Sequence, residues 1–115
     1  MTQSEFIEMA LYKPWQNRAC SWDAMDCWGV VIMYYRHVLE IEIPVTHGYS
    51  NGECSIIEGV NQQLENFDKI DRPSGDAIVF LAFEGDEPTH VGVMISKTKM
   101  IHARGSEETC GTVSI

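Results

Sequence analysis

The spacing of apolar residues changes near residue 76, and this change constrains the fold more than any other feature of the chain. Before it, apolar side chains recur every three or four positions, which predicts amphipathic helices. Three stretches show this spacing: residues 4–12, 27–39 and 55–67. After it, short apolar runs between turn residues predict strands over 76–83, 90–95, 99–104 and 112–115. Helices followed by an antiparallel sheet define the α+β class.

Local signals set several of these boundaries. Pro14 ends the first helix, because the residue before a proline disfavours the helical conformation, and Asp26 is placed to cap the second helix. The run 76–83 is almost entirely apolar and is predicted to be a buried strand. A tight turn is expected near residues 96–98, a loop at 84–88, and an edge strand at the C-terminus. The length suits one domain, residues 1–115, with one modest core.

The composition argues against several classes of function. The net charge is −9, and nucleic-acid binding depends on clustered Lys and Arg, so no nucleic-acid partner is expected. No run of about 18 apolar residues occurs, so no membrane partner is expected. The N-terminal residues lack the features of a secretory signal. The four cysteines have irregular spacing, which argues against a disulfide framework or a zinc site, and neither a metal nor a cofactor is expected.

Cys27 is the candidate nucleophile. It opens the second predicted helix within the sequence Asp-Cys-Trp-Gly at residues 26–29. The thiolate is the reactive form of cysteine, and the unpaired N–H groups and dipole of a helix N-terminus favour an anion. We therefore expect the pKa of Cys27 to be lowered. The same N–H groups can supply one arm of an oxyanion hole.

Two histidines on later strands can complete such a site. His90 follows a loop and begins a strand, and it is the candidate base because imidazole titrates near neutrality. In a hairpin centred on Ser96, His90 and His102 lie directly opposite each other, within about 5.5 Å at Cα. His102 would then hold the ring of His90 through a hydrogen bond. A nucleophile, a base and an orienting group make up the general triad.

A set of short segments, taken in order, carries a family resemblance. They are residues 13–15 (Lys-Pro-Trp), 26–31 (Asp-Cys-Trp-Gly-Val-Val), 75–80 (Gly-Asp-Ala-Ile-Val-Phe), 90–93 (His-Val-Gly-Val) and 100–103 (Met-Ile-His-Ala). Together they resemble the NlpC-type cell-wall cysteine peptidases, a compact papain-like superfamily. The resemblance covers about residues 11–104. Each segment is weak alone, but the ordered set is quite specific.

The resemblance implies hydrolysis of amide bonds in peptidoglycan stem peptides by a papain-like domain. It gives Cys27 the role of nucleophile, His90 that of base and His102 that of third polar residue. Trp28 stands where serine is common, and this variant resembles members among tailed-phage tail proteins. Phage tail proteins are then expected partners, and the expected location is the host cytoplasm during assembly and the virion tail afterwards. Trp15 stands where cell-wall members usually carry a tyrosine that helps at the oxyanion site, and its indole N–H donates but does not accept.

Other interpretations stay open. A structural tail protein with the same fold and little activity is one, a secreted antibacterial peptidoglycan amidase is another, and acyl transfer to an amine would share the thioester. Asp26 is most simply a helix cap, and His37 lies on another face of its helix from Cys27. His47 is expected to be solvated. The other cysteines are expected to be passive: Cys20, Cys54 and Cys110.

Overall fold

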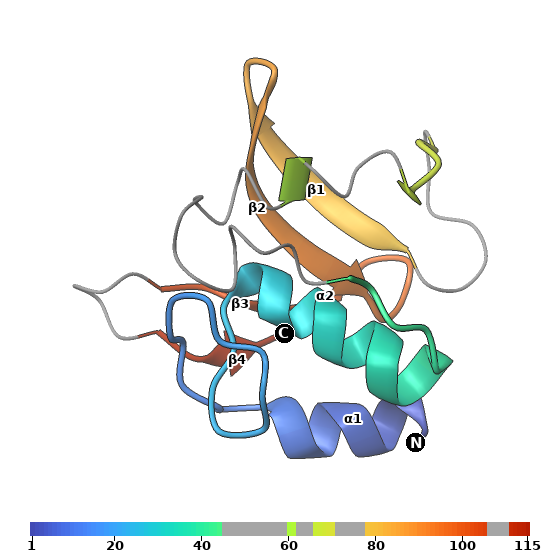
Figure 1. Ribbon diagram of the computed structural model, residues 1–115, viewed down its shortest axis with the longest axis vertical. Coiled ribbons are helices and arrows are strands. Elements are labelled where there is room, and N and C mark those ends of the chain that lie inside the picture. Colours follow the sequence, from blue (N-terminus) through green and yellow to red (C-terminus); the bar gives the residue numbers. More distant parts are fainter. Residues whose placement is uncertain (45–59, 62–65, 71–77, 106–110) are drawn as a thin grey trace.

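The helices precede the strands along the chain, as the change of spacing predicts (Figure 1). The computed structural model describes residues 1–44, 60–61, 66–70, 78–105 and 111–115, without the side chains of residues 87 and 88. The helices are α1 (Gln3–Ala10), α2 (Cys27–Tyr34) and the π-helix η1 (Tyr35–Leu39). The strands are β1 (Val79–Glu84), β2 (Glu87–Met94), β3 (Met100–Ala103) and β4 (Val113–Ser114). This order confirms the α+β class. The predicted helix 55–67 lies mostly outside the described residues.

Helix α1 begins at a capping box. The Thr2 hydroxyl accepts from the Glu5 N–H at 3.1 Å, and the Glu5 carboxylate accepts from the Thr2 N–H at 2.9 Å. Both bonds satisfy N–H groups that a helix N-terminus leaves unpaired. Phe6 is fully buried and meets Tyr34 edge to face, with ring centroids 5.2 Å apart. This aromatic contact packs α1 against the far end of α2.

Helix α2 is buried on every side. All eight of its residues are in the core, so burial in α2 extends beyond the one face that helical spacing predicts. A helix that is apolar all round is typical of a core element with neighbours on each face. The helix continues as η1, which ends at Leu39 because the next residue, Glu40, adopts φ 57°. Together, α2 and η1 span the predicted helix over residues 27–39. Among the described residues, no helix has the length and apolar character needed to cross a membrane.

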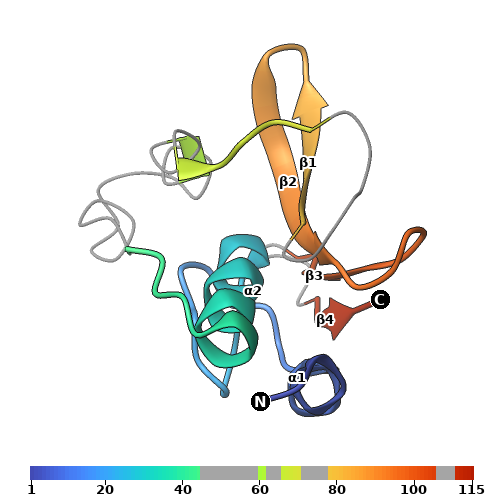
Figure 2. The same ribbon diagram turned by 90° about the vertical axis from the view of Figure 1, so that its right-hand side faces the viewer.

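The sheet is an antiparallel meander with the strand order β1-β2-β3-β4. A two-residue turn at Gly85 and Asp86 joins β1 to β2, and Gly85 adopts φ +62°, a conformation that glycine allows at little cost. Strand β2 therefore begins at Glu87 rather than at the predicted residue 90. The β1–β2 hairpin extends well beyond α2, whereas β3 and β4 lie beside the helices (Figures 1 and 2).

Strand β1 is not the buried strand that its apolar sequence predicts. Phe80 is 43% exposed and Phe83 is 54% exposed. The strand pairs with β2, and its register shifts between Ala82 and Phe83. Because the hairpin projects past α2, this helix does not cover the outer part of β1 (Figures 1 and 2).

Strand β4 is the last strand of the sheet, as expected, but its outer side is covered. The segment that follows α1 runs along its outer side: the Tyr12 N–H donates to the Val113 carbonyl at 3.0 Å, and the Val113 N–H donates to the Lys13 carbonyl at 2.9 Å. The Trp15 N–H donates to the Gly111 carbonyl at 2.7 Å. The backbone groups of β4 are thus paired on both sides, which protects an edge that would otherwise be exposed.

Candidate active site

The start of α2 is held in place by Asp26. Its buried carboxylate accepts from the Gly29 N–H at 2.6 Å and from the Arg18 N–H at 2.7 Å. The first bond is the N-cap expected for this residue, and the second ties the preceding loop to the helix. Gly29 lies against the carbonyl oxygen of Ala19, which a Cβ at this position would overlap. Two residues of the Asp-Cys-Trp-Gly motif therefore have structural roles that fix the position of Cys27.

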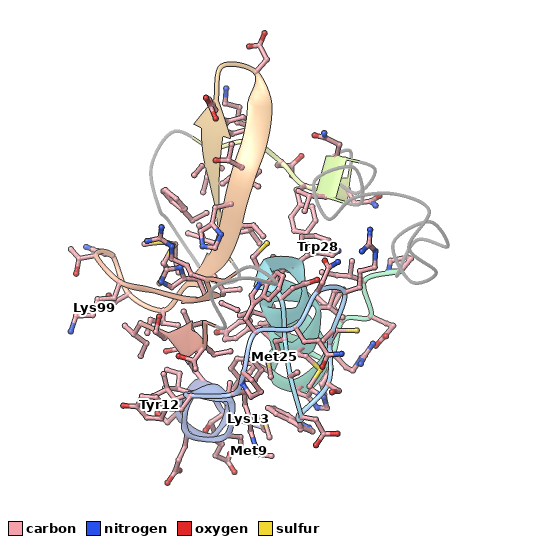
Figure 3. The ribbon with its side chains drawn as sticks, turned by 90° about the vertical axis from the view of Figure 1, so that its left-hand side faces the viewer. Met9, Tyr12, Lys13, Met25, Trp28 and Lys99 are labelled. Atoms are coloured by element: carbon pink, nitrogen blue, oxygen red, sulfur yellow. The ribbon has the colours of Figure 1, made fainter. Side chains whose placement is uncertain are left out.

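Strands β2 and β3 separate close to this helix start. Their last paired residues are Val93 and Ile101, after which β3 pairs with β4 instead. The N–H groups of β2 alternate in direction: the Met94 N–H donates to Ile78, before β1, and the Ile95 N–H donates to Lys99, before β3. By this alternation the Val91 N–H points toward the side where β3 has left. Figure 3 shows Lys99 at the other end of the β2–β3 pair, where the turn joins the two strands.

The Cys27 sulfur meets this freed N–H group. The backbone N–H groups of Trp28, Val91 and Cys27 itself all favour the thiolate form of Cys27. Val91 directly follows His90, so the sulfur lies beside the strand that carries the candidate base. Trp28 marks this end of α2 in Figure 3, where its ring meets that of Phe67 with centroids 6.4 Å apart. The residue Cys27 is only 8% exposed.

The two histidines of the neighbouring strands are hydrogen-bonded. His90 Nε2 and His102 Nδ1 lie 2.8 Å apart, and both side chains are half-buried. The predicted direct pairing is wrong, however. The observed pairs centre the turn on Lys97, so the continued register sets His102 across from Gly92 and diagonally to His90. A shift of two residues keeps both rings on one face of the sheet, which is why the ring contact survives the change of register.

Burial shifts the pKa values of Cys27, His90 and His102 in the direction that favours their neutral forms. It raises the pKa of Cys27 to about 12, and the Asp26 carboxylate adds to this effect. The expectation of a lowered Cys27 pKa is therefore wrong, because loss of solvent outweighs the helix N-terminus. Burial also lowers the pKa of His90 to about 4, with further contributions from His102 and Arg104. The pKa of His102 is lowered by burial and then by Arg104.

Trp15 lies beside Gly105, which follows the end of β3. Its side chain packs on Gly105, where a Cβ would come within 2.8 Å of Trp15 Cγ. The adjacent Pro14 carbonyl accepts from the Met25 N–H at 3.1 Å, which joins this segment to the residues before α2. These contacts explain how Trp15 is fixed. A role for its indole at an oxyanion stays a prediction.

The other histidines and cysteines include two described residues, His37 and Cys20. His37 stacks on Trp22 with ring centroids 4.8 Å apart, and its carbonyl accepts from the N-terminal ammonium group. These contacts are with the N-terminus and with Trp22, whereas the sequence predicts only that His37 lies on another face of its helix from Cys27. His47, Cys54 and Cys110 lie outside the described residues, and Cys20 is half-buried.

Sequence reasoning missed two elements of the cluster, the Val91 N–H and Gly92. The alternating strand pattern of residues 90–95 contains both residues. Neither carries a side chain that could suggest a role, so only the register and the separation of β2 from β3 reveal them.

One comparison identifies the family of this chain. The family model described as NlpC/P60 family matches residues 13–114, which is most of the sequence. No curated protein and no solved structure matches the chain.

Proposed function

Since the chain belongs to the NlpC/P60 family, which suggests a cell-wall peptidase or amidase, we propose that it hydrolyses an amide bond in peptidoglycan stem peptides. The nucleophile is the Cys27 sulfur, the base is His90 and the group that orients the base is His102. One observation carries this proposal. A cysteine at a helix start contacts the N–H of Val91, and the preceding His90 is hydrogen-bonded to a second imidazole at 2.8 Å.

The hydrogen bond between the imidazoles decides which nitrogen of His90 can act. His90 Nε2 is engaged by His102 Nδ1, so Nδ1 of His90 is the nitrogen left for proton transfer. This role requires the neutral His90 ring to carry its proton on Nε2. That N–H then donates a hydrogen bond to Nδ1 of His102. The bond then strengthens when His90 becomes an imidazolium, because charged donors form the stronger hydrogen bonds.

The reaction begins from a neutral thiol and a neutral imidazole. His90 Nδ1 takes the proton of the Cys27 thiol as the sulfur bonds to the substrate carbonyl carbon, and the carbonyl electrons move to oxygen. The Cys27 N–H donates to that oxyanion, with Trp15 as the proposed second donor. When the C–N bond breaks, the His90 imidazolium gives its proton to the leaving amine. Water, deprotonated by His90, then cleaves the thioester and restores the thiol.

Digestion of purified muropeptides tests the proposal. Wild type and Cys27→Ala are incubated with the same muropeptides, and the fragments are identified by mass. We expect a new free amine and carboxylate within the stem peptide for wild type alone. Identical fragment patterns for the two proteins would refute hydrolysis by Cys27. Product masses also distinguish hydrolysis from acyl transfer, which would join the acyl group to an added amine.

A structural protein with little activity is the second candidate. The observation that favours it is the burial of Cys27, which is 8% exposed and has its pKa raised to about 12. Such a protein would keep the fold and the family sequence but turn over stem peptides no faster than Cys27→Ala. The same digestion therefore separates the two functions.

We also propose a setting for the activity, a phage tail that opens a local path through the cell wall. The Asp-Cys-Trp-Gly variant at residues 26–29 supports it through its resemblance to tail proteins. The net charge of −9 supports delivery by an assembly partner, because an acidic protein is repelled by an anionic wall. Tight binding of the isolated protein to purified sacculi would count against this setting.

A further inference from the structure

Gly92 lies between the two histidines on the sheet and has no side chain. Continuing the β2–β3 register sets it directly across from His102, while His90 is two residues earlier on β2. The bond of 2.8 Å between the rings therefore runs diagonally across the strands and past Gly92. Diagonal neighbours in a sheet are separated by roughly 7–8 Å at the backbone, so such a contact requires the rings to lean toward each other.

A side chain at residue 92 would meet atoms that have little freedom to move. A Cβ there would lie 3.1 Å from His102 Cβ and 3.0 Å from the Ile101 carbonyl oxygen. Both neighbours are fixed by the backbone of β3. The third neighbour, Met100 Sδ at 3.0 Å, is the end of a flexible side chain and can turn away. Any larger residue therefore pushes β3 from β2 by a few tenths of an ångström, at the residue that carries His102.

We propose that Gly92 is a positioning residue of the active site: its lack of a side chain lets His102 reach across the sheet and hold His90. This inference rests on the proposed function for its catalytic consequence, but the placement of His102 against His90 can be measured by itself. Gly92 does not touch the reacting atoms. Its effect passes through the hydrogen bond between the two rings.

The proposal has a spectroscopic consequence that does not depend on activity. Burial is the largest cause of the lowered His90 pKa. The electrostatic effects of His102 and Arg104 lower it further. Moving His102 away removes its electrostatic contribution and also its hydrogen bond to the His90 ring. In Gly92→Ala, the pKa of His90 should therefore differ from its wild-type value.

The test is a double-mutant cycle read by NMR titration of the histidine rings. We expect Gly92→Ala and His102→Ala to shift the His90 pKa in the same direction, and the double variant to show no shift beyond that of His102→Ala. Stem-peptide turnover should fall on the order of tenfold in Gly92→Ala, since small displacements of catalytic groups carry such penalties, and should change little when Gly92→Ala is added to His102→Ala. Gly85→Asn is the matched control, because this glycine lies in the same strand pair with open space around its Cβ.

Each result has a definite meaning. An unchanged His90 titration in Gly92→Ala, or an equal shift from Gly92→Ala with and without His102, would overturn the proposal. If Gly92→Ala does not fold, Gly92→Ala with Met100→Ala removes the sulfur contact and keeps the contact with His102, and the same titration decides. A shifted titration in a protein whose wild type cleaves no muropeptide would support the role of Gly92 and refute the hydrolase.

Discussion

At the scale of single residues, the shifted pKa values of Cys27 and His90 favour a neutral pair before substrate binds. The pKa of Cys27 is raised to about 12 and that of His90 is lowered to about 4, in both cases mainly by burial. A neutral thiol and a neutral imidazole can react only if the proton moves as the sulfur attacks. The protein would thus differ from a cysteine hydrolase that stores a ready thiolate.

The neutral pair predicts a specific pH dependence. His90 acts as a base only when unprotonated, so activity is lost as the pH falls through its lowered pKa. We expect the acid limb of kcat/KM near pH 4 and well below 6.5. At pH 7, the absorbance at about 240 nm should be the same for wild type and Cys27→Ser, since a thiol lacks the thiolate band. An acid limb at 6.5 or above, or a thiolate band at pH 7, would contradict this description.

The sequence identifies the reactive residues better than it identifies their state. Cys27, His90 and His102 stand out because sulfur and imidazole are rare and chemically specific. The direction of the Cys27 pKa shift could not be predicted, because a helix N-terminus is visible in the sequence whereas the burial of the Cys27 side chain depends on tertiary packing. Gly29 and Asp26, in contrast, carry a local signal, and Asp26 caps α2 as expected.

At the scale of elements, the junction between the loop of residues 15–25 and α2 fixes the nucleophile. Asp26 bonds to both sides of this junction, and Gly29 lets the Ala19 carbonyl lie on the first turn of the helix. The Ala19 carbonyl also accepts from the Asp26 N–H at 3.0 Å. The loop and the helix start are therefore joined into one hydrogen-bonded unit.

Gly29→Ala should break this unit. The added Cβ overlaps a backbone oxygen that cannot rotate away, so the loop must move and its hydrogen bonds weaken. We expect a loss of about 1–3 kcal/mol in the free energy of unfolding, the usual range for overpacking a core. Urea denaturation measures it, with Gly85→Asn as a control that should lie close to wild type. Equal stability of Gly29→Ala and wild type would show that the loop is not held as described.

The strand register illustrates where local reasoning stops. Residues 96–98 do form the turn, but its centre is Lys97 rather than Ser96, because Ile95 and Lys99 pair across it. Hydrogen bonds from the N–H groups of Thr98 and Lys99 to the Ser96 hydroxyl help to set this geometry. The apolar pattern keeps Val91, Val93 and Ile101 on the buried face in either register, so it cannot distinguish the two.

At the scale of the whole molecule, the core joins α1, α2, β2, β3 and β4, and the active-site cluster lies at its margin. The α+β order was predictable from the change of hydrophobic spacing. The exposure of β1 and the covering of β4 were not, because both depend on contacts between segments far apart in the chain. Residues 12–15 and 111–113 meet across almost the full sequence. That residues 1–115 form one domain stays a prediction.

The buried imidazoles should make the fold sensitive to mild acid. The folded-state pKa of His90 and that of His102 lie below their ordinary values, so the unfolded chain binds more protons between pH 6.5 and about 4. Stability therefore falls as the pH drops through this window. After allowance for solvent screening of half-buried groups, we expect a loss of about 1–2 kcal/mol. Urea titrations at pH 7 and pH 5 measure this loss. Between these two pH values, a variant with both His90→Gln and His102→Gln should lose less stability than wild type does. An equal loss in both proteins would assign the effect to other groups.

Capture of the covalent intermediate tests the role of Cys27 in the molecule as a whole. Wild type is mixed with a stem peptide, quenched in acid within one turnover and digested, and the fragments are weighed. The proposed chemistry requires an acyl group on the fragment that contains Cys27. This acyl group should disappear as the free carboxylic acid product forms. Cleavage of the stem peptide with an unmodified Cys27, or with the acyl group on Cys20 instead, would contradict it.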